Sequence, residues 1–546
     1  MRLRVLAVTA IALLGAACSG EPQVELDDAL ATISKESFDA TTHFLADDRL
    51  KGRATASPEY ILAANFVADR FAEMGLQPGG DDGWFQQVPF VTAAIDAKNS
   101  GVVLHTAAGD HELAWITDTV VFPDAVRDEL EVRAEVVFVG FGIHAPELGY
   151  SDYDGIDVEG KIVATFWGGP DTFPDAELAY HTSAETKAAE LARRGAVGQI
   201  LMWDRQEQVD YDWDDYYAEY PSGPSLSWIN DAGEASGHFP QRRGFADISP
   251  ASAEKLFADS PISFEDALDA AEEFRPMPTA LGIEATLYQK AGHERYDSPN
   301  VVAILPGSDP ELADEYVVFS SHLDHIGTKE GDDEDLIYNG FYDNAVGIAV
   351  MLESARALSQ LSHAPRRSIV FLAVTGEEDG LFGSDYFVQN PTVPQGSIVA
   401  NVNVDMPVII YPMSTMTVYG FESSTLGPPT AEEVALEGFE IRPDAFPEEN
   451  YIGRSDQYSF ATQGIPFVYL AEGVESSDPD IDGMALAIAF EENHYHQVSD
   501  DLSQPLHWES MERFIRVSAR VTRRIAMDDN APVWVEGDFF GDTFGP

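Results

Sequence analysis

The stretch 366–380, "RRSIVFLAVTGEEDG", contains the pattern that decides the predicted fold. Its β-branched and apolar run predicts a central strand. Glu377 and Glu378 stand side by side where that strand ends. Carboxylates at the carboxyl end of a buried strand are rarely needed for folding, because burying them costs free energy unless they are paired. The pair therefore indicates a functional site.

Segments on both sides of this strand alternate between strand-like and helix-like patterns. Apolar residues recur at helical spacing in 344–361 and 508–527. Strand patterns are found at 314–322, 396–405 and 465–472. Such alternation predicts an α/β fold with a mostly parallel central sheet flanked by helices.

The chain has 546 residues, which is too long for one compact core. Between about 96 and 285, short strand patterns are separated by Gly, Pro and Asp turns, which indicates an inserted β-rich module. The predicted organisation is a signal peptide at 1–18, a first part of the α/β domain at 26–95, the inserted module at 96–285, the main part of the α/β domain at 286–530 and a C-terminal tail at 531–546.

The N-terminal sequence "MRLRVLAVTAIALLGAACSG" has two arginines, a short apolar segment and then small residues. It is typical of a signal for export. Cys18, the sole cysteine, ends a segment that resembles a bacterial lipoprotein box, although Gly15 stands where leucine is usual. We expect an exported protein: periplasmic, anchored to the outer membrane by a lipid on Cys18, or extracellular. A plain signal peptide with an incidental cysteine is the alternative.

The charge of the chain is strongly negative, with 94 acidic and 32 basic residues and a formal net charge of −62. This balance argues against nucleic acid and anionic membrane surfaces as partners. Solubility in a salty medium explains it most simply, because ions screen the repulsion between like charges. A surface that attracts a positively charged substrate is the alternative.

His, Asp and Glu recur where the predicted strands end, in "SSHLDHIG", "GFYDNAVG", "TGEEDG", "NVDMP" and "HYHQVSDD". Parallel α/β sheets carry their functional residues at the carboxyl ends of the strands. Imidazoles and carboxylates without a thiolate suit zinc, and their number suggests two metal ions. Adjacent side chains leaving a strand point in different directions, so one glutamate can bind a metal while the other faces a water molecule.

The pieces "HLDHIG", "YDNAVG", "GEEDGLFGS" and "YHQVSDD" resemble the co-catalytic zinc peptidases, the family of bacterial leucyl aminopeptidases and glutamate carboxypeptidase. The resemblance covers about 290 to 530. It implies two zinc ions, with His322 and Asp405 on the first, Glu378 and His496 on the second, and Asp343 bridging both. It also implies that Glu377 is the general base, that the Asp324 carboxylate orients His322, and that the inserted module is a protease-associated domain.

Other residues near these motifs receive weaker assignments. The family motif leaves His325 unused, and the spacing to "SDD" favours His496 over His494 as the ligand. Tyr451 is a candidate oxyanion donor, with simple packing as the alternative, and Arg454 is a candidate for substrate binding. Gln457 stands where relatives often carry a histidine.

The predicted function is hydrolysis of N-terminal residues from peptides by an exported zinc aminopeptidase. An acidic site attracts a cationic α-amine, whose pKa is about 7.7–8.0. A carboxypeptidase or dipeptidase on the same scaffold is one alternative. A non-catalytic binding protein that resembles transferrin receptor is the other. The sequence does not indicate the oligomeric state.

Overall fold

The computed structural model describes residues 25–219, 225–230, 232–331 and 335–545. The predicted signal peptide and Cys18 lie outside these ranges and stay predictions. Within the described ranges, every helix is too short or too polar to span a bilayer.

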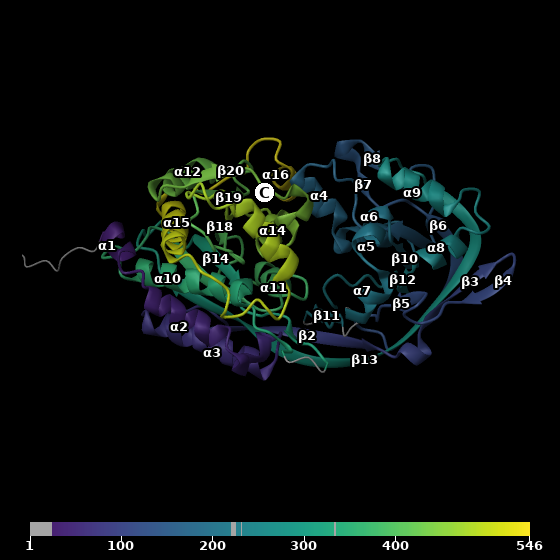
Figure 1. Ribbon diagram of the computed structural model, residues 1–546, viewed down its shortest axis with the longest axis horizontal. Helices are drawn as coiled ribbons and strands as arrows, with labels where there is room; N and C mark the ends of the chain where they lie inside the picture. Colours follow the sequence, from purple (N-terminus) through teal and green to yellow (C-terminus); the bar gives the residue numbers. More distant parts are fainter. Residues whose placement is uncertain (1–24, 220–224, 231, 332–334, 546) are drawn as a thin grey trace, which may run out of the picture.

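One half of the molecule is built on a central sheet whose inner strands run parallel (Figure 1). Its strand order is β13–β17–β14–β18–β21–β19–β20, with antiparallel pairs only at β13–β17 and β21–β19. The bounds are β13 (Thr279–Leu305), β14 (Tyr316–His322), β17 (Ser368–Val374), β18 (Ile398–Asn403), β19 (Thr415–Tyr419), β20 (Glu440–Arg442) and β21 (Phe467–Glu472). The predicted α/β fold is therefore confirmed.

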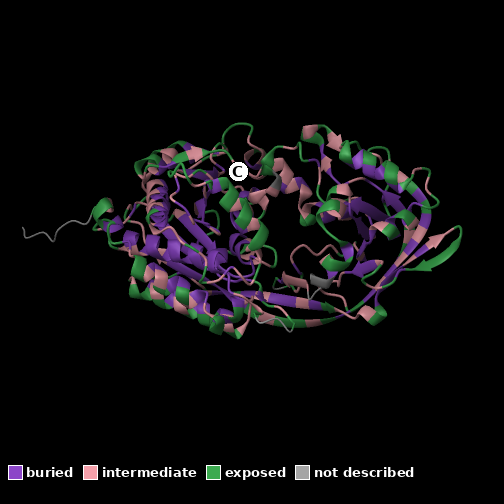
Figure 2. Cartoon of the chain, viewed as in Figure 1, coloured by how far each residue is buried: buried purple, intermediate pink, exposed green. Residues whose placement is uncertain are grey.

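Helices cover both faces of this sheet. On one face lie α2 (Lys35–Leu45), α3 (Pro58–Glu73), α10 (Gly347–Ser359) and α15 (Trp508–Met527), and on the other lie α11 (Phe382–Gln389) and α13 (Gln457–Ala461). Ile369, Phe371 and Ala373 of β17 pack against the first set. Val370, Leu372 and Val374 pack against the second. Because both faces are covered, β17 is buried along its whole length and is apolar from Ile369 to Val374. Figure 2 shows the buried strands of this sheet.

The second half has a hydrophobic core of its own, which extends from Val102 to Leu287 along the chain. Its strands include β3 (Gly101–Thr106), β4 (Gly109–Glu112), β5 (Thr119–Val121), β6 (Glu129–Phe138), β9 (Ile162–Phe166), β10 (Gly198–Met202) and β12 (Phe245–Ile248), and its helices include α5 (Ala184–Arg193), α8 (Pro250–Leu256) and α9 (Phe264–Glu272). The assignment of this half as a protease-associated domain stays a prediction.

Two long strands connect the halves. β2 (Phe85–Ile95) pairs antiparallel with β13 from Phe85 opposite Val301 to Ile95 opposite Ala291. Further toward its amino end, β13 pairs with β3 and β6 of the second half. The predicted boundary at 285 and 286 thus falls inside a single 27-residue strand, which enters both sheets.

Candidate metal centre

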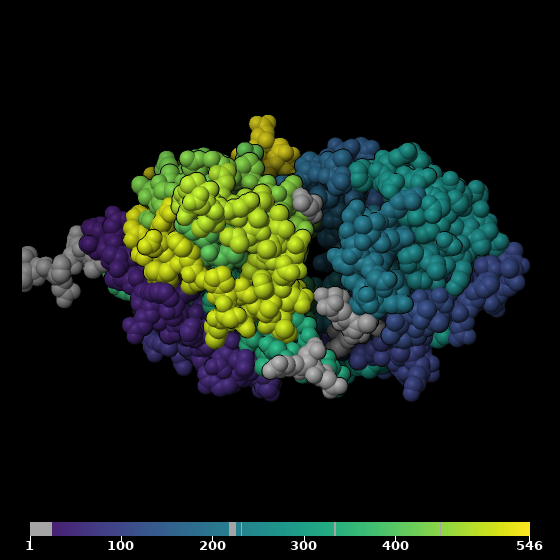
Figure 3. All heavy atoms as spheres, in the orientation of Figure 1, coloured from purple at the N-terminus to yellow at the C-terminus, as the bar shows by residue number. Residues whose placement is uncertain are grey.

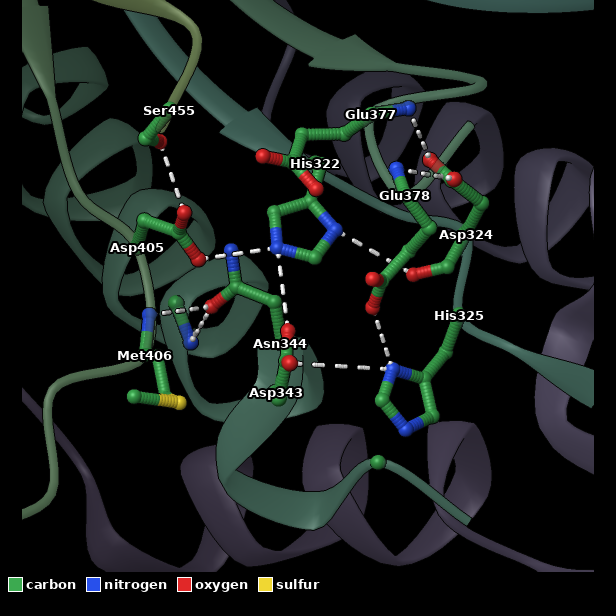
Figure 4. Close-up of polar contacts among 12 residues, drawn as sticks. His322, Asp324, His325, Asp343, Asn344, Glu377, Glu378, Asp405, Met406 and Ser455 are labelled. Atoms are coloured by element: carbon green, nitrogen blue, oxygen red, sulfur yellow. Dashed lines mark hydrogen bonds and ion pairs between the residues drawn. The ribbon is translucent and has the colours of Figure 1, made fainter. Parts of the chain in front are cut away.

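The predicted metal ligands converge at the carboxyl ends of the parallel strands. Figure 4 shows four of them: His322, Asp343, Glu378 and Asp405. His322 is the last residue of β14, and Asp405 lies two residues after β18. Glu378 follows β17, and Asp343 lies in a π-helical turn, η4 (Phe341–Val346), immediately before α10. His496 follows α14 (Gly483–Asn493). Five separate parts of the chain therefore meet at one edge of the sheet.

His322, Asp343 and Asp405 form the first part of the centre. The Nε2 atom of His322 lies 2.8 Å from Asp405 Oδ1 and 3.1 Å from Asp343 Oδ1. Its Nδ1 atom lies 3.2 Å from the backbone carbonyl oxygen of Asp324. A carbonyl oxygen only accepts, so Nδ1 carries the proton in this contact and Nε2 is the atom that faces the two carboxylates. Against the effect of burial, these carboxylates raise the pKa of His322 well above its usual value. A metal ion can take the place of the proton among these three ligand atoms.

His496, Asp343 and Glu378 form the second part. The Nε2 atom of His496 lies 3.3 Å from Asp343 Oδ2 and 3.2 Å from Glu378 Oε2. Asp343 therefore presents one oxygen to each part of the centre. A carboxylate in this position suits a bridge between two metal ions.

The donor set fits zinc. It consists of two imidazoles and three carboxylates, and side chains of His322, Asp343 and Glu378 come within 4.8 Å of one another at single ligand atoms. Asp343, Glu377 and Asp405 are buried. Buried carboxylates at such close quarters repel one another unless a cation compensates them.

The role predicted for Asp324 needs a correction. Its backbone carbonyl, and not its carboxylate, contacts His322. The carboxylate oxygens instead lie 3.3 Å from the amide nitrogens of Glu377 and Glu378, which donate to them. Burial raises the pKa of Asp324 to about 7. By accepting from both amides, the Asp324 side chain fixes the turn that carries the two glutamates. The sequence did not reveal this role, because it cannot show which atom of Asp324 faces the imidazole.

Three further side chains support the ligands and were not predicted in these roles. His325 Nδ1 lies 2.6 Å from Glu378 Oε1. The Asp500 carboxylate accepts from the amides of Tyr342 and Asp343, at 3.0 to 3.1 Å. Ser455 Oγ donates to Asp405 Oδ2 at 2.6 Å. Asp500 belongs to the "SDD" motif, and this motif was the only indication in the sequence that Asp500 lies near the site.

Glu377 and Glu378 differ in ionisation. Burial and the negative charge of Asp405 raise the pKa of Glu377 well above its usual value, although His322 opposes this. Burial and Asp343 also favour a proton on Glu378, but its contacts with His325 and His496 outweigh them and lower its pKa to about 2. One carboxyl group therefore holds a proton readily, and its neighbour stays charged.

A cavity of about 270 Å³ opens onto the centre. It is lined by His322, Asp343, Glu377, Glu378, Gly380, Leu381, Asp405, Met406, Tyr451, Gly453, Arg454, Ser455, Tyr469, Tyr495 and His496. Both predicted substrate-binding residues, Tyr451 and Arg454, are among them. Arg454 already contacts Glu449 at 2.6 Å and the Tyr495 hydroxyl at 3.2 Å. His494 does not line this cavity, and its Nδ1 atom lies 2.8 Å from Ser499 Oγ.

Gln457 has a structural task beside the cavity. Its amide nitrogen donates to the carbonyl oxygens of Tyr451, at 3.1 Å, and Ile452, at 2.9 Å. Its amide oxygen accepts from Asn403 at 2.8 Å. The side chain thus ties the loop that bears Tyr451 to the end of β18.

Several known proteins resemble this chain in sequence. Residues 300–522 match the model of peptidase family M28. Aminopeptidase NAALADL1 of Mus musculus is 26% identical over 297 residues, which are 46% of this chain and 36% of that protein. Leupeptin-inactivating enzyme 1 of Streptomyces exfoliatus is 28% identical over 205 residues, which are 36% of this chain and 40% of that enzyme.

The structure of an aminopeptidase from Aneurinibacillus sp. strain AM-1 is similar over 92% of this chain and 95% of its own, with a TM-score of 0.52 and 19% identity. At this identity the likeness concerns the fold. The chain spans less than half the length of the curated relatives it matches.

Proposed function

We propose that this chain, whose residues 300–522 match peptidase family M28, is an exported aminopeptidase with two zinc ions and a glutamate general base. The match confirms the predicted resemblance to the co-catalytic zinc peptidases and the predicted class, a metallopeptidase. One observation supports the proposal most directly: Asp343 lies between two groups of ligands in a cavity that Glu377 also lines.

His322 and Asp405 would hold one zinc ion, and Glu378 and His496 would hold the other. Bound zinc polarises a carbonyl group and lowers the pKa of a water molecule. Around the ligands, His325 fixes Glu378, Asp500 fixes the backbone of Asp343, and Ser455 fixes Asp405. Such supporting contacts hold a metal site in one geometry.

Glu377 is the proposed general base. It accepts a proton from the attacking water molecule and returns it to the nitrogen of the leaving amine, so the proton balance closes within one turnover. Two features favour this role: its place on the cavity wall and the raised pKa that burial and Asp405 give it. The hydrogen bond from its amide to Asp324 keeps the turn in place.

The cavity favours the amino end of a peptide over the carboxyl end. Asp343, Glu377, Glu378 and Asp405 all line it, and a peptide α-amine is cationic near neutral pH. Binding a free carboxylate requires a basic group, and Arg454 is already paired with Glu449. The carboxypeptidase alternative depends on Arg454 leaving that ion pair.

The test compares one apolar peptide with its amino-acetylated and carboxyl-amidated forms, before and after chelation of metal. We expect acetylation and chelation to abolish cleavage, amidation to be tolerated, and zinc to restore activity. Cleavage of the acetylated form but not the amidated form would identify a carboxypeptidase. Zinc-loaded protein that cleaves no peptide would support the non-catalytic alternative.

Export and a lipid on Cys18 are part of this proposal. The apolar segment before Cys18 and the small residues beside it favour lipidation. Cys18→Ala should move the protein from the membrane fraction to the soluble fraction, because a lipid supplies the attachment. A wild-type protein that is fully soluble, with an unmodified N-terminus by mass spectrometry, would contradict this prediction.

A further inference from the structure

The loop 451–455 forms one side of the cavity beside the metal centre. Tyr451, Gly453, Arg454 and Ser455 line the cavity. Ile452, which stands between the first two, is 9% exposed and belongs to a separate apolar cluster. The loop therefore has one side toward the cavity and one side toward this cluster.

The apolar cluster behind the loop includes a residue from the other half of the molecule. Its buried members are Ala179, Ile452, Ala461, Phe467 and Phe540. Ala179 belongs to α4 (Asp175–Thr182), a helix of the second half, which packs against the turn Tyr451–Gly453. A hollow separates the two halves in the middle of the face seen in Figure 3. At α4 the second half nevertheless reaches the wall of the cavity.

The contact between α4 and the loop has almost no spare room. A methyl group added at Gly453 would lie 3.2 Å from Ala179 Cβ and 3.4 Å from its Cα. The 3.2 Å spacing is tighter than most van der Waals contacts, so a methyl group at Gly453 makes the loop or the helix give way by a few tenths of an ångström. The φ angle of Gly453 is not positive, so alanine there meets a steric obstacle and no backbone strain.

Other contacts hold α4 in place. The Tyr180 ring lies 5.4 Å from the rings of Phe539 and Phe544 of α16 (Phe539–Phe544). His181 Nε2 lies 2.5 Å from Glu147 Oε1 within the second half. Figure 1 shows α4 next to α16, near the C-terminus. Because α4 is held on two sides, and Gln457 holds the loop, crowding at this contact acts on both the helix and the loop.

A displaced loop also disturbs the far wall of the cavity. Arg454 donates to the Tyr495 hydroxyl, and the Tyr495 ring stacks on the His496 imidazole at 3.9 Å. The contact at Ala179 is therefore connected to the second group of ligands through Arg454 and Tyr495.

We propose that Ala179 is a positioning residue: through it, α4 of the second half sets the place of Tyr451 and Arg454 in the cavity, so the second half takes part in substrate binding. The inference deepens the proposed function and depends on it. A side-chain shift of about 1 Å at a binding wall costs up to roughly a hundredfold in catalytic efficiency. Packing against a fixed helix prevents such a shift.

The test moves one methyl group across the contact: Gly453→Ala adds it on the loop, and Ala179→Gly removes it from α4. Gly453→Ala, Ala179→Gly and the double variant are compared with the wild type by KM and kcat on an aminoacyl-nitroanilide, with zinc content and thermal unfolding measured in parallel. We expect Gly453→Ala to raise KM roughly tenfold with a smaller change in kcat, because the cavity wall moves and the base stays in place. The double variant should return KM to within about twofold of the wild type.

Ala192→Gly supplies the control, because Ala192 lies on the neighbouring helix α5 and does not line the cavity. Combined with Gly453→Ala, it should leave KM raised. If the wild type is active but the double variant at 179 and 453 keeps the raised KM, the inference is overturned while the proposed function stands. The methyl group at 453 would then act directly on the substrate. A wild type inert toward every peptide would overturn the proposed function as well.

Discussion

At the scale of single residues, the two glutamates after β17 have different neighbours. Glu378 contacts His325 on one oxygen and His496 on the other. Glu377 lines the cavity and carries a raised pKa. Adjacent residues of one turn can therefore have separate tasks, provided that the turn is fixed, and Asp324 fixes it by accepting from both amides.

Replacing each glutamate by glutamine should separate the two tasks. Glu377→Gln is expected to lower kcat by about 10²–10⁴-fold and to retain both zinc ions, because only the proton acceptor is lost. Glu378→Gln should also lower zinc content, because a ligand is lost. Zinc per chain is measured by elemental analysis after dialysis. Equal zinc contents in the two variants would contradict the division of tasks.

Asp500 offers a second prediction at this scale. Its carboxylate accepts from the amides of Tyr342 and Asp343, and so holds the backbone of the bridging residue. Asp500→Asn should weaken zinc affinity about 10–100-fold, the usual cost of losing such support. Zinc titration against a competing chelator measures the effect. Asp501→Asn is the matched control, because the Asp501 carboxylate accepts from the amide of Ser503, outside the site.

At the scale of elements, β17 shows how far the sequence leads. Its apolar run predicts a central strand correctly, because such a run depends only on neighbours in the sequence. The roles of the two glutamates after it stay predictions. The helix predicted at 508–527 is α15 (Trp508–Met527) with the same bounds. Periodicity did not reveal that β13 enters two sheets, because alternation along a strand is independent of which partner pairs with it. The sequence also did not predict contacts such as that between His325 and Glu378, because these depend on the direction of the side chains.

The packing of β17 predicts a large effect of a single substitution. Phe371 is fully buried, and its ring lies 6.1 Å from the rings of Phe71 and Phe319. Phe371→Ala should lower the free energy of unfolding by about 3–5 kcal/mol, because it leaves a cavity between the sheet and α3. Urea unfolding of the zinc-loaded protein measures it. Leu436→Ala, at a position that is 67% exposed, serves as control, and a similar small loss in both variants would refute the argument.

At the scale of the whole molecule, charge is the dominant feature. Many ion pairs join exposed side chains, as at Arg205, which contacts Glu265 and Asp269. Such exposed pairs each contribute little to stability. With 94 acidic and 32 basic residues, the carboxylates outnumber the cationic side chains by 62. Repulsion among them opposes the compact state.

Salt should therefore stabilise this protein. The Debye length falls from about 10 Å at 0.1 M to about 3 Å at 1 M, so added ions screen the repulsion of a chain with net charge −62. We expect Tm, measured with saturating zinc, to rise by several degrees between 0.1 and 1 M KCl. A neutral osmolyte at equal osmolality is the control, because excluded solutes also stabilise compact states. If the osmolyte raises Tm as much as KCl does, screening is not the cause, and the acidic surface has to be explained by attraction of a cationic substrate.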